Sequence, residues 1–419
     1  MKYTIRASKH IDATIDLPAS KSISNRALVI CHLAQSSDDA LRNISNCDDT
    51  RVMARALNSM PGTIDINGAG TAMRFLTAYL AVTEGGTRTL TGNERMCHRP
   101  IGLLVNALRR LGADIDYAGA EGYPPLRITG GSLEGGYVEM PGNVSSQYVS
   151  ALLLIGPVLE RGLMLRLTGD IISRPYIDLT IHIMHDFGAH VEWTDIDTIE
   201  VEPVPYTVKP YKVENDWSAA SYWYEIMALG GNSEDIVRLK GLNDGSRQGD
   251  SVVRYIFSLL GVKTSFTLNA HDKSSEVTLR CIPTRLKRLE YDFKNQPDMA
   301  QTFVVSCALL NIPFRFTGLP TLRIKETDRI EAVKKEMRKI GYMVHDGGGS
   351  ELVWDGDRCT PDDEPIVIDT HDDHRMAMAF APLALRLPQI SIVNPQVVSK
   401  SYPRFWDDLR LAGFNITEE

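Results

Sequence analysis

An internal repeat constrains the fold of this 419-residue sequence more than any other feature. Five segments join the end of a helix, a small turn and a strand: RRLGADIDY, HDFGAHVEW, SLLGVKTSF, RKIGYMVHD and LRLAGFNI. Their turn residues are Gly112, Gly188, Gly261, Gly341 and Gly413, and a weaker copy, ALNSMPGTIDI, contributes Gly62. A glycine between a helix and a strand predicts a helix C-cap in the left-handed region.

A second series of features keeps nearly the same spacing. Apolar helices are predicted to begin at small or polar residues near Lys21, Gly70, Ser145, Ser218, Asp298 and His374. Two independent features rarely share a spacing by chance. The sequence therefore predicts six units, each with two helices and several short strands, in a mixed α/β architecture.

The segment 202–215, EPVPYTVKPYKVEN, carries three prolines and lies between the third and fourth units. A proline-rich connector between equal sets of repeats predicts two domains of three units each, joined by a hinge.

Composition narrows the class of protein. Asp and Glu number 53 against 45 Lys and Arg, and the net charge of -8 argues against a general nucleic-acid binder. Apolar stretches such as 151–155 are far shorter than the roughly 20 residues that span a bilayer, and the first 17 residues contain no apolar signal core. The six cysteines form no CxxC pair, so we expect reduced thiols, a cytoplasmic location and no membrane partner.

The predicted helix starts are the candidate binding elements. Free N–H groups and about half a positive charge at each helix N-terminus attract anions, although any one polar start can simply be a cap. Cations gather near these starts: Lys21, Arg26, Arg74, Arg99, Lys325, Arg329, His374, Arg375, Lys400 and Arg404. Lys325 and Arg329 are four residues apart and would face one another on a helix. They form either a solvated charged turn or a pair that holds an anion.

Several other chemistries are disfavoured. The sequence has no GxxxxGK[ST] motif, and GAGTAM at 68–73 lacks the third glycine of a dinucleotide fingerprint. His371 and His374 suggest a metal site, but neighbouring side chains in this run diverge, so no metal is expected. Cys97 is either a nucleophile or, more commonly for such a residue, an incidental thiol.

Ten short motifs occur in the order of one family. They are LPASKSISNRAL, NGAGTAMR, RMCHRPIG, VSSQ, SRPYID, RQGD, QPDMA, RIKETDR, DDHRMAM and SKSYPRFW. Together they resemble the 5-enolpyruvylshikimate-3-phosphate synthases among the enolpyruvyl transferases. The resemblance covers essentially the whole chain. It implies an inside-out α/β barrel of two similar domains, each of three βαβαββ repeats, with domains at 19–208 and at 1–18 plus 209–419.

The resemblance implies a reaction and its ligands. The enolpyruvyl group of phosphoenolpyruvate would pass to the 5-hydroxyl of shikimate 3-phosphate by addition and elimination, which releases phosphate on the route to chorismate and the aromatic amino acids. Residues implied at shikimate 3-phosphate are Lys21, Ser22, Arg26, Ser145, Ser146, Gln147, Ser173, Tyr176, Asp298, Thr321 and Lys325. Those implied at phosphoenolpyruvate are Lys21, Gly70, Thr71, Arg99, Gln147, Arg329, Arg375 and Lys400.

The resemblance also implies catalytic roles. Asp298 would accept the proton of the 5-hydroxyl, and Glu326 would exchange the methyl proton, with Lys21 and His374 assisting. No cofactor or metal is expected, because Lys, Arg and helix ends supply the positive charge. The expected partners are the two small substrates alone, bound to a monomer that closes around the hinge, with glyphosate competing against phosphoenolpyruvate.

Three positions depart from the family pattern. Gly68 and Thr321 stand where the family usually has Asn, and Phe75 stands where it usually has Pro. One alternative is UDP-N-acetylglucosamine enolpyruvyl transferase, whose loop cysteine lies five residues before its Arg-Pro, where this chain has Glu94. The other alternative is a non-catalytic regulator that binds phosphorylated metabolites.

Overall fold

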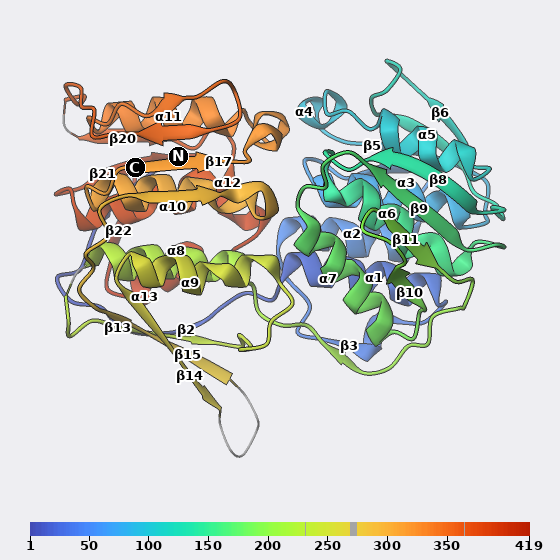
Figure 1. Cartoon of the computed structure of the whole chain (residues 1–419), viewed down its shortest axis with the longest axis horizontal. Coiled ribbons are helices and arrows are strands. Elements are labelled where there is room, and N and C mark those ends of the chain that lie inside the picture. Colours follow the sequence, from blue (N-terminus) through green and yellow to red (C-terminus); the bar gives the residue numbers. More distant parts are fainter. Residues whose placement is uncertain (231, 269–274, 364) are drawn as a thin grey trace. The chain divides into compact units, whose positions relative to one another are not determined.

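The computed structural model describes residues 1–230, 232–268, 275–363 and 365–419 (Figure 1). The chain forms two compact units. We call Ser20–Val213 the middle unit, and Met1–Ala19 together with Glu214–Glu419 the terminal unit. Residues 211–212 pair with a strand of the middle unit, and the hinge near 202–215 stays a prediction.

The middle unit contains two four-stranded sheets and a small third one. In strand order, the sheets are β4 (Thr63–Asp65), β5 (Thr87–Thr91), β7 (Leu126–Thr129) and β6 (Asp114–Tyr117); β10 (Val191–Trp193), β11 (Thr198–Val201), β9 (Leu163–Thr168) and β8 (Gly136–Pro141); and the pair β12 (Tyr211–Lys212) and β3 (Leu41–Arg42). Each four-stranded sheet places a parallel pair beside an antiparallel hairpin.

The terminal unit contains three sheets of the same kind. In strand order, they are β2 (Asp12–Asp16), β13 (Ile236–Lys240), β15 (Ser275–Cys281) and β14 (Val262–Leu268); β16 (Leu289–Asp292), β17 (Phe314–Thr317), β19 (Leu352–Trp354) and β18 (His345–Asp346); and β20 (Ile366–Asp369), β21 (Ile390–Val393), β1 (Lys2–Arg6) and β22 (Asn415–Glu418). The first two strands of the chain therefore complete sheets made by its later segments.

Three buried helices form the centre of each unit. They are α1 (Lys21–Leu33), α3 (Gly70–Val82) and α6 (Ser146–Ile155) in the middle unit, and α8 (Trp217–Gly230), α10 (Ala300–Leu309) and α12 (His374–Phe380) in the terminal unit. All six begin within two residues of their predicted starts, which confirms that series. Every residue of α10 is buried, as expected for a helix that is apolar on all sides.

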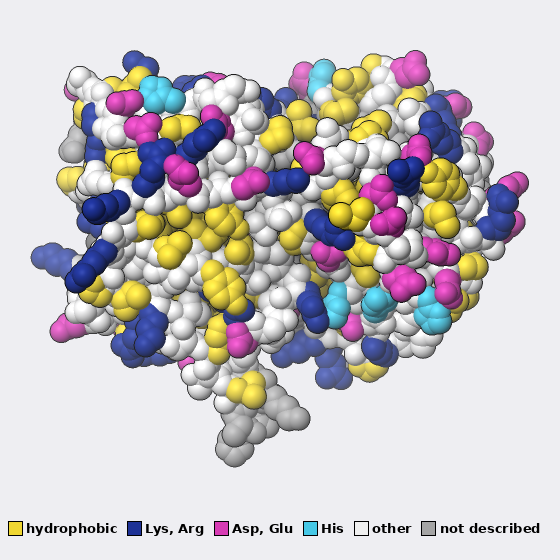
Figure 2. Space-filling view, in the orientation of Figure 1, with side chains coloured by type: hydrophobic (Ala, Val, Ile, Leu, Met, Phe, Trp, Pro, Cys, Tyr) yellow, Lys and Arg dark blue, Asp and Glu magenta, His cyan; other side chains and the backbone are white. Residues whose placement is uncertain are grey.

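The remaining helices are amphipathic or short. They are α2 (Asp48–Ser59), α4 (Glu94–Cys97), α5 (Gly102–Arg110), α7 (Arg174–Asp186), α9 (Val253–Leu259), α11 (Arg329–Lys339) and α13 (Phe405–Leu411). Within the described ranges, no helix has both the length and the apolar character needed to cross a bilayer. In the view of Figure 2, basic and acidic side chains are interspersed over the surface of each unit.

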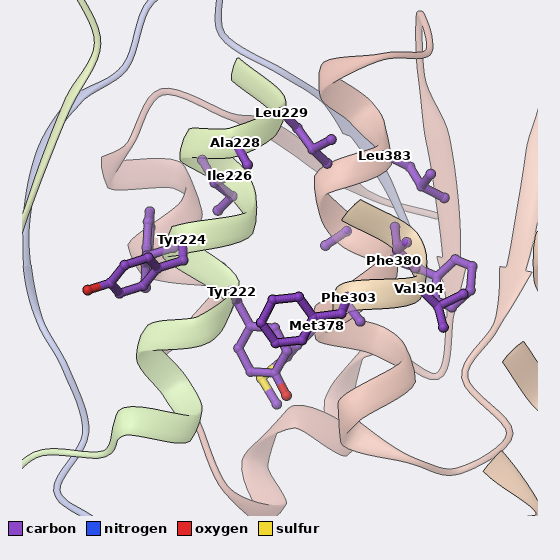
Figure 3. Close-up of a cluster of buried hydrophobic side chains, with 14 of the residues drawn as sticks. Tyr222, Tyr224, Ile226, Ala228, Leu229, Phe303, Val304, Met378, Phe380 and Leu383 are labelled. Carbon is purple, nitrogen blue, oxygen red and sulfur yellow. The ribbon is translucent and has the colours of Figure 1, made fainter. Parts of the chain in front are cut away.

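Aromatic and aliphatic side chains join the central helices of the terminal unit. Figure 3 shows Tyr222 of α8, Phe303 of α10 and Met378 of α12 in one cluster. The Phe303 ring lies 4.7 Å from that of Phe257 and 5.4 Å from that of Phe293, between ring centroids. Burial of each such side chain contributes roughly 1.5–3 kcal/mol. The packing therefore fixes the helices and, with them, their N-terminal residues.

The sheets and helices together confirm the mixed α/β prediction. The chain order β16, α10, β17, α11, β18, β19 is one βαβαββ unit, and both four-stranded sheets of the middle unit follow this order of strands. The other two sheets of the terminal unit take one strand each, β2 and β1, from the start of the chain. In the terminal unit, α8, α10 and α12 contact strands of separate sheets (Figure 1). The strands of the described residues form these separate sheets and close no barrel.

The glycine series is confirmed at five positions and wrong at the sixth. Gly112, Gly188, Gly261, Gly341 and Gly413 have φ between 81° and 105°. At the end of α2 the left-handed residue is Met60, with φ 42°. Pro61 follows and cannot continue the helix, so the turn comes two residues before Gly62.

Candidate active site

In the middle unit, the N-termini of α3 and α6 lie together. The Gln147 side chain donates from Nε2 to Thr71 Oγ1 at 3.2 Å. The Ser145 hydroxyl caps α6 by accepting from the Gln147 N–H at 3.4 Å. The structure thus joins the predicted residues Gly70, Thr71, Ser145, Ser146 and Gln147 at two helix ends that favour anions.

Arg99 lies directly over the first residue of α3. A Cβ atom at Gly70 would lie only 2.8 Å from the Arg99 NH1 atom, so a larger residue at Gly70 would displace the guanidinium. Arg99 Nε is buried, and no group of the described residues accepts its hydrogen. A cation with an unused donor at a helix N-terminus is suited to a bound anion.

Lys21 begins α1 and pairs with a residue that the sequence analysis missed. Its Nζ lies 3.0 Å from Oδ2 of Asp49, a buried residue in the first turn of α2. The only signal was the acidic pair Asp48 and Asp49, which resembles the common placement of acids at a helix start.

Arg26 faces the interior of the middle unit and is only 3% exposed. Its guanidinium donates to Thr180 Oγ1 at 2.7 Å, to the Ser22 carbonyl at 2.8 Å, to Ser150 Oγ at 3.0 Å and to the Tyr176 carbonyl at 3.3 Å. Burial lowers the pKa of Arg26 to about 10. In this structure Arg26 joins α1 to α6 and α7, and it contacts the predicted ligands Ser22 and Tyr176 through their backbone.

Two residues singled out from the sequence, Ser173 and Phe75, have an unusual backbone conformation and an unusual neighbour, respectively. Ser173, before α7, adopts a left-handed conformation with φ 54°, and its hydroxyl makes no capping hydrogen bond. A non-glycine residue held in this region often marks a functional position. Phe75 is buried, and its ring centroid lies 5.3 Å from the Arg26 guanidinium carbon, so this departure from the family pattern packs against Arg26.

In the terminal unit, Asp298 lies in a 3-10 turn, Pro297–Met299, just before α10. Its Oδ1 is 3.0 Å from Lys325 Nζ and 2.8 Å from Arg329 NH1, and its Oδ2 is 3.6 Å from Arg375 NH2. The idea that Lys325 and Arg329 face one another on one helix is wrong, because Lys325 ends a 3-10 helix and Arg329 begins α11. The anion between them is the chain's own carboxylate.

These contacts change the ionisation of Asp298. Burial alone would raise its pKa, but attraction to Lys325, Arg375 and Arg329 outweighs burial and leaves the pKa well below that of an ordinary aspartate. Burial lowers the pKa of Lys325, and attraction to Asp298 only partly offsets this effect. Asp298 is therefore ionised over the physiological pH range.

Arg329 connects Asp298 to two further carboxylates and is only 1% exposed. Its NH2 lies 2.9 Å from Glu326 Oε2, and its Nε lies 2.6 Å from Asp373 Oδ2. Burial would lower the pKa of Arg329, yet attraction to Asp373, Glu326 and Asp298 raises it above its ordinary value. Lys400 Nζ lies 3.4 Å from the other oxygen of Glu326. We call Asp298, Glu326 and Asp373 the carboxylate cluster.

Asp373 is the second residue that the sequence analysis missed. It is fully buried and caps α12 by accepting from the Arg375 N–H at 2.9 Å. His374 follows as the first residue of α12, with its Nδ1 3.5 Å from Asp373 Oδ1. The motif DDHRMAM contains Asp373, but its chain neighbours give no sign of the contact with Arg329, 44 residues away.

Three further residues singled out from the sequence are Thr321, His371 and Cys97. The Thr321 hydroxyl oxygen is buried and has no hydrogen-bond partner among the described residues. His371 bonds Glu336, so it diverges from His374, and the described residues contain no group of three or more potential metal ligands. The Cys97 thiol donates to the Gly92 carbonyl at 3.5 Å, an ordinary contact for an incidental thiol.

Comparisons with known proteins identify the family of the chain. The sequence model of the EPSP synthase (3-phosphoshikimate 1-carboxyvinyltransferase) family matches residues 5–68 and 61–409. A 3-phosphoshikimate 1-carboxyvinyltransferase of Bacteroides fragilis is 57% identical over 416 residues, which cover 99% of each chain. A protein of the same name from Photobacterium profundum is 35% identical over 435 residues, which cover 97% of each chain.

Solved structures share the fold. EPSP synthase from Acinetobacter baumannii aligns over 100% of both chains with a TM-score of 0.75 at 19% identity. The enolpyruvyl transferase NikO from Streptomyces tendae aligns over 99% of this chain and 98% of its own with a TM-score of 0.70 at 15% identity. The family match, the full-length relatives and the shared fold together place the chain in the EPSP synthase (3-phosphoshikimate 1-carboxyvinyltransferase) family.

Proposed function

We propose that this chain transfers the enolpyruvyl group of phosphoenolpyruvate to the 5-hydroxyl of shikimate 3-phosphate, giving 5-enolpyruvylshikimate 3-phosphate and phosphate. The observation that carries the proposal is the carboxylate cluster. Arg329 holds Asp298 and Glu326 together, and Lys325, Arg375 and Lys400 lie beside them. In this proposal Asp298 and Glu326 are the two proton-transfer groups, and the cations beside them supply the positive charge that the reaction requires.

The reaction requires one base and one group that gives and takes a proton. In the addition step, C3 of phosphoenolpyruvate gains a proton while the 5-oxygen loses its proton and bonds to C2. In the elimination step, C3 loses a proton, the C2–C3 double bond returns, and the bond from C2 to the phosphate oxygen breaks. We assign the 5-hydroxyl proton to Asp298 and the C3 proton to Glu326, with Lys21 and His374 in assisting roles.

The ionised state of Asp298 makes it ready to accept a proton but weakly basic. Lys325, Arg375 and Arg329 stabilise its charge and hold its pKa low. Both substrates carry a phosphate and a carboxylate, which compete with Asp298 for the same cations. Once Lys325 and Arg375 bind substrate anions, Asp298 loses part of this stabilisation and becomes a stronger base. Binding of substrate would thus activate the base.

The middle unit supplies polar groups that suit anion binding. We propose that Ser145, Ser146 and Ser173 bind shikimate 3-phosphate, and that Arg99 at Gly70 binds phosphoenolpyruvate. The unused Nε donor of Arg99 supports its assignment. No metal or cofactor enters this proposal, because Lys and Arg side chains provide the charge stabilisation. We further propose that the chain acts as a monomer, which size-exclusion chromatography with light scattering tests directly.

A coupled assay tests the function. The purified chain is mixed with phosphoenolpyruvate and shikimate 3-phosphate, and phosphate release is measured together with the mass of the product. We expect equal amounts of phosphate and 5-enolpyruvylshikimate 3-phosphate, unchanged after exhaustive chelation. Phosphate release with UDP-N-acetylglucosamine in place of the sugar phosphate would instead favour the related transferase. Binding of both ligands without turnover would favour a regulator.

A further inference from the structure

The loop that joins β20 to α12 has an unusual backbone. His371 has a φ of 50° and Asp372 a φ of 55°, so two successive non-glycine residues lie in the left-handed region. L-residues adopt this region at an energetic cost, and such conformations persist only where neighbouring groups hold them. The next residue is Asp373 of the carboxylate cluster. The contacts that hold this loop are therefore relevant to the chemistry.

One of these contacts is a pair between His371 of the loop, which is partly exposed, and a buried carboxylate of α11. His371 Nε2 lies 2.8 Å from Oε1 of Glu336, and the Glu336 side chain is fully buried. Because a carboxylate only accepts, the Nε2 atom carries the hydrogen. The other oxygen of Glu336 accepts from Lys339 Nζ at 2.6 Å and from the Asp369 N–H at 3.1 Å. The buried carboxylate is thus satisfied on both sides.

The loop and α11 contact each other a second time, at Asp373 and Arg329. α11 begins at Arg329 and carries Glu336 two turns later, whereas the loop carries His371 and then Asp373. Asp373 accepts from Arg329 Nε at 2.6 Å and from its NH2 at 3.3 Å. One pair thus fixes the loop to the body of α11, and the other pair places the Arg329 guanidinium.

We propose that His371 and Glu336 are positioning residues for the enolpyruvyl transfer. They hold the left-handed loop against α11, so that Asp373 orients Arg329 and Arg329 in turn orients Asp298 and Glu326. This inference rests on the proposed function and adds two residues to it that do not contact the reacting atoms. The alternative is that the pair only stabilises the fold.

Charged groups surround the His371 imidazole and decide which substitutions keep its contact with Glu336. Glu336 and Lys339 face this region from α11, and Asp369 and Asp372 flank it from its own segment. Asn394, which follows β21, donates to Asp372 at 3.2 Å and adds no charge. A variant that keeps an N–H donor should therefore retain the contact with Glu336, and a variant without one should leave that carboxylate unpaired on one side.

The test compares His371→Leu with His371→Gln, because the Gln amide nitrogen can occupy the place of Nε2. We expect kcat of His371→Leu to fall at least about tenfold at a temperature well below its Tm, since small misplacements of catalytic groups are costly. We expect His371→Gln to stay within about threefold of the parent. His345→Leu is the matched control, because His345 pairs with Asp357 at the same 2.8 Å on the exposed surface of this unit.

The pH profile provides a readout that stability alone would not move. If Arg329 shifts, the carboxylates lose positive charge and their pKa values rise. The acid limb of the kcat profile should then move to higher pH in His371→Leu but not in His371→Gln or His345→Leu. Glu336→Met keeps the length of the side chain but removes both acceptor oxygens, so it should show the same shift as His371→Leu and decides the question if the Leu variant does not fold.

The outcomes separate this inference from the proposed function. A parent protein without turnover would overturn the proposed function and, with it, the inference. An active parent whose His371→Leu and Glu336→Met variants keep its kcat and acid limb, even with a lower Tm, would overturn the inference alone. It would show that the pair only stabilises the fold.

Discussion

The middle and terminal units satisfy their buried arginines in opposite ways. Arg26 donates to hydroxyls and backbone carbonyls, which are all neutral. Arg329 donates to the three acids of the carboxylate cluster. Burial lowers the pKa of Arg26 to about 10, whereas the three carboxylates raise that of Arg329 despite its burial.

We propose that this difference separates most of the substrate binding from most of the proton transfer. The middle unit offers helix N-termini, hydroxyls and Arg99, which suit fixed anions such as phosphate and carboxylate. The terminal unit offers acids whose charge depends on the cations beside them, which suits proton transfer. We therefore expect substitutions of the site residues in the terminal unit to change kcat most, and substitutions of those in the middle unit to change substrate binding or stability most.

The largest effect should come from Asp298→Asn. The amide cannot accept the 5-hydroxyl proton, and general-base contributions are typically 10²- to 10⁴-fold. We expect kcat to fall at least about 100-fold, or roughly 3 kcal/mol of barrier, with the Kd of shikimate 3-phosphate within about tenfold. Phosphate release under saturation and calorimetric titration measure the two quantities.

Stability supplies a second readout for Asp298→Asn. The folded pKa of Asp298 lies below its ordinary value of 3.8, so the ionised group stabilises the fold above that pH. We expect a lower Tm at pH 7 and a difference that shrinks as the pH falls below 3.8. The matched control is Asp328→Asn at the N-cap of α11, where Asn caps about as well as Asp. A near-normal kcat in Asp298→Asn would reduce Asp298 to a structural ion pair.

Arg26→Lys tests the opposite half of the comparison. An ammonium group cannot reach the four oxygen acceptors that the guanidinium contacts, so the folded state should lose roughly 3 kcal/mol of stability. Thermal unfolding measures this loss, and kcat of the folded variant should change far less than in Asp298→Asn. An unchanged Tm with a weakened Kd for shikimate 3-phosphate would show that Arg26 leaves the interior to bind substrate directly.

The repeated features were predictable because they depend on local sequence. The starts of α1, α3 and α12 follow from a small or polar residue before an apolar run, and the glycine caps follow from the turn geometry. The contacts of Asp49 and Asp373 were not predictable, because they join residues 28 and 44 positions apart. Family motifs contain the catalytic candidates but do not show which oxygen faces which cation. That information exists only after the helices pack.

The core of the terminal unit also holds a buried acid, Glu225, to which we assign no role in the chemistry. Glu225 of α8 is fully buried, and a contact with Ser306 of α10 only partly offsets the effect of burial on its ionisation. Burial raises its pKa well above the ordinary 4.5. Replacement by Met removes a buried carboxyl group and keeps the volume, so we expect Glu225→Met to gain about 1–2 kcal/mol of unfolding free energy. Denaturant unfolding measures the gain.

The gain should also depend on pH. A folded pKa above the unfolded one means that the stability of the parent is complete below about pH 4.5 and is lost as the pH rises towards the folded pKa. The advantage of Glu225→Met should therefore widen as the pH rises. Glu225→Gln is the control, because it removes the titration but keeps a polar group. If the unfolding free energies of parent and variants change with pH in the same way, the pKa of Glu225 is the same in the folded and unfolded protein, and this prediction is wrong.

The smallest effect, and the finest test of the middle unit, concerns Ser173→Gly. The left-handed φ of 54° strains the backbone at Ser173, and its hydroxyl makes no capping hydrogen bond. Glycine at this position therefore relieves the strain and loses no capping bond. The greater freedom of glycine in the unfolded chain offsets part of this gain. We expect unfolding free energy to rise by about 0.5–1 kcal/mol, while the KM for shikimate 3-phosphate rises several-fold because a proposed ligand hydroxyl is gone. Higher stability with weaker binding would mean that the strain at Ser173 is kept for substrate. Lower stability with unchanged KM would instead make Ser173 a structural residue, and anion binding in this unit would then depend on Ser145, Ser146 and Arg99 alone.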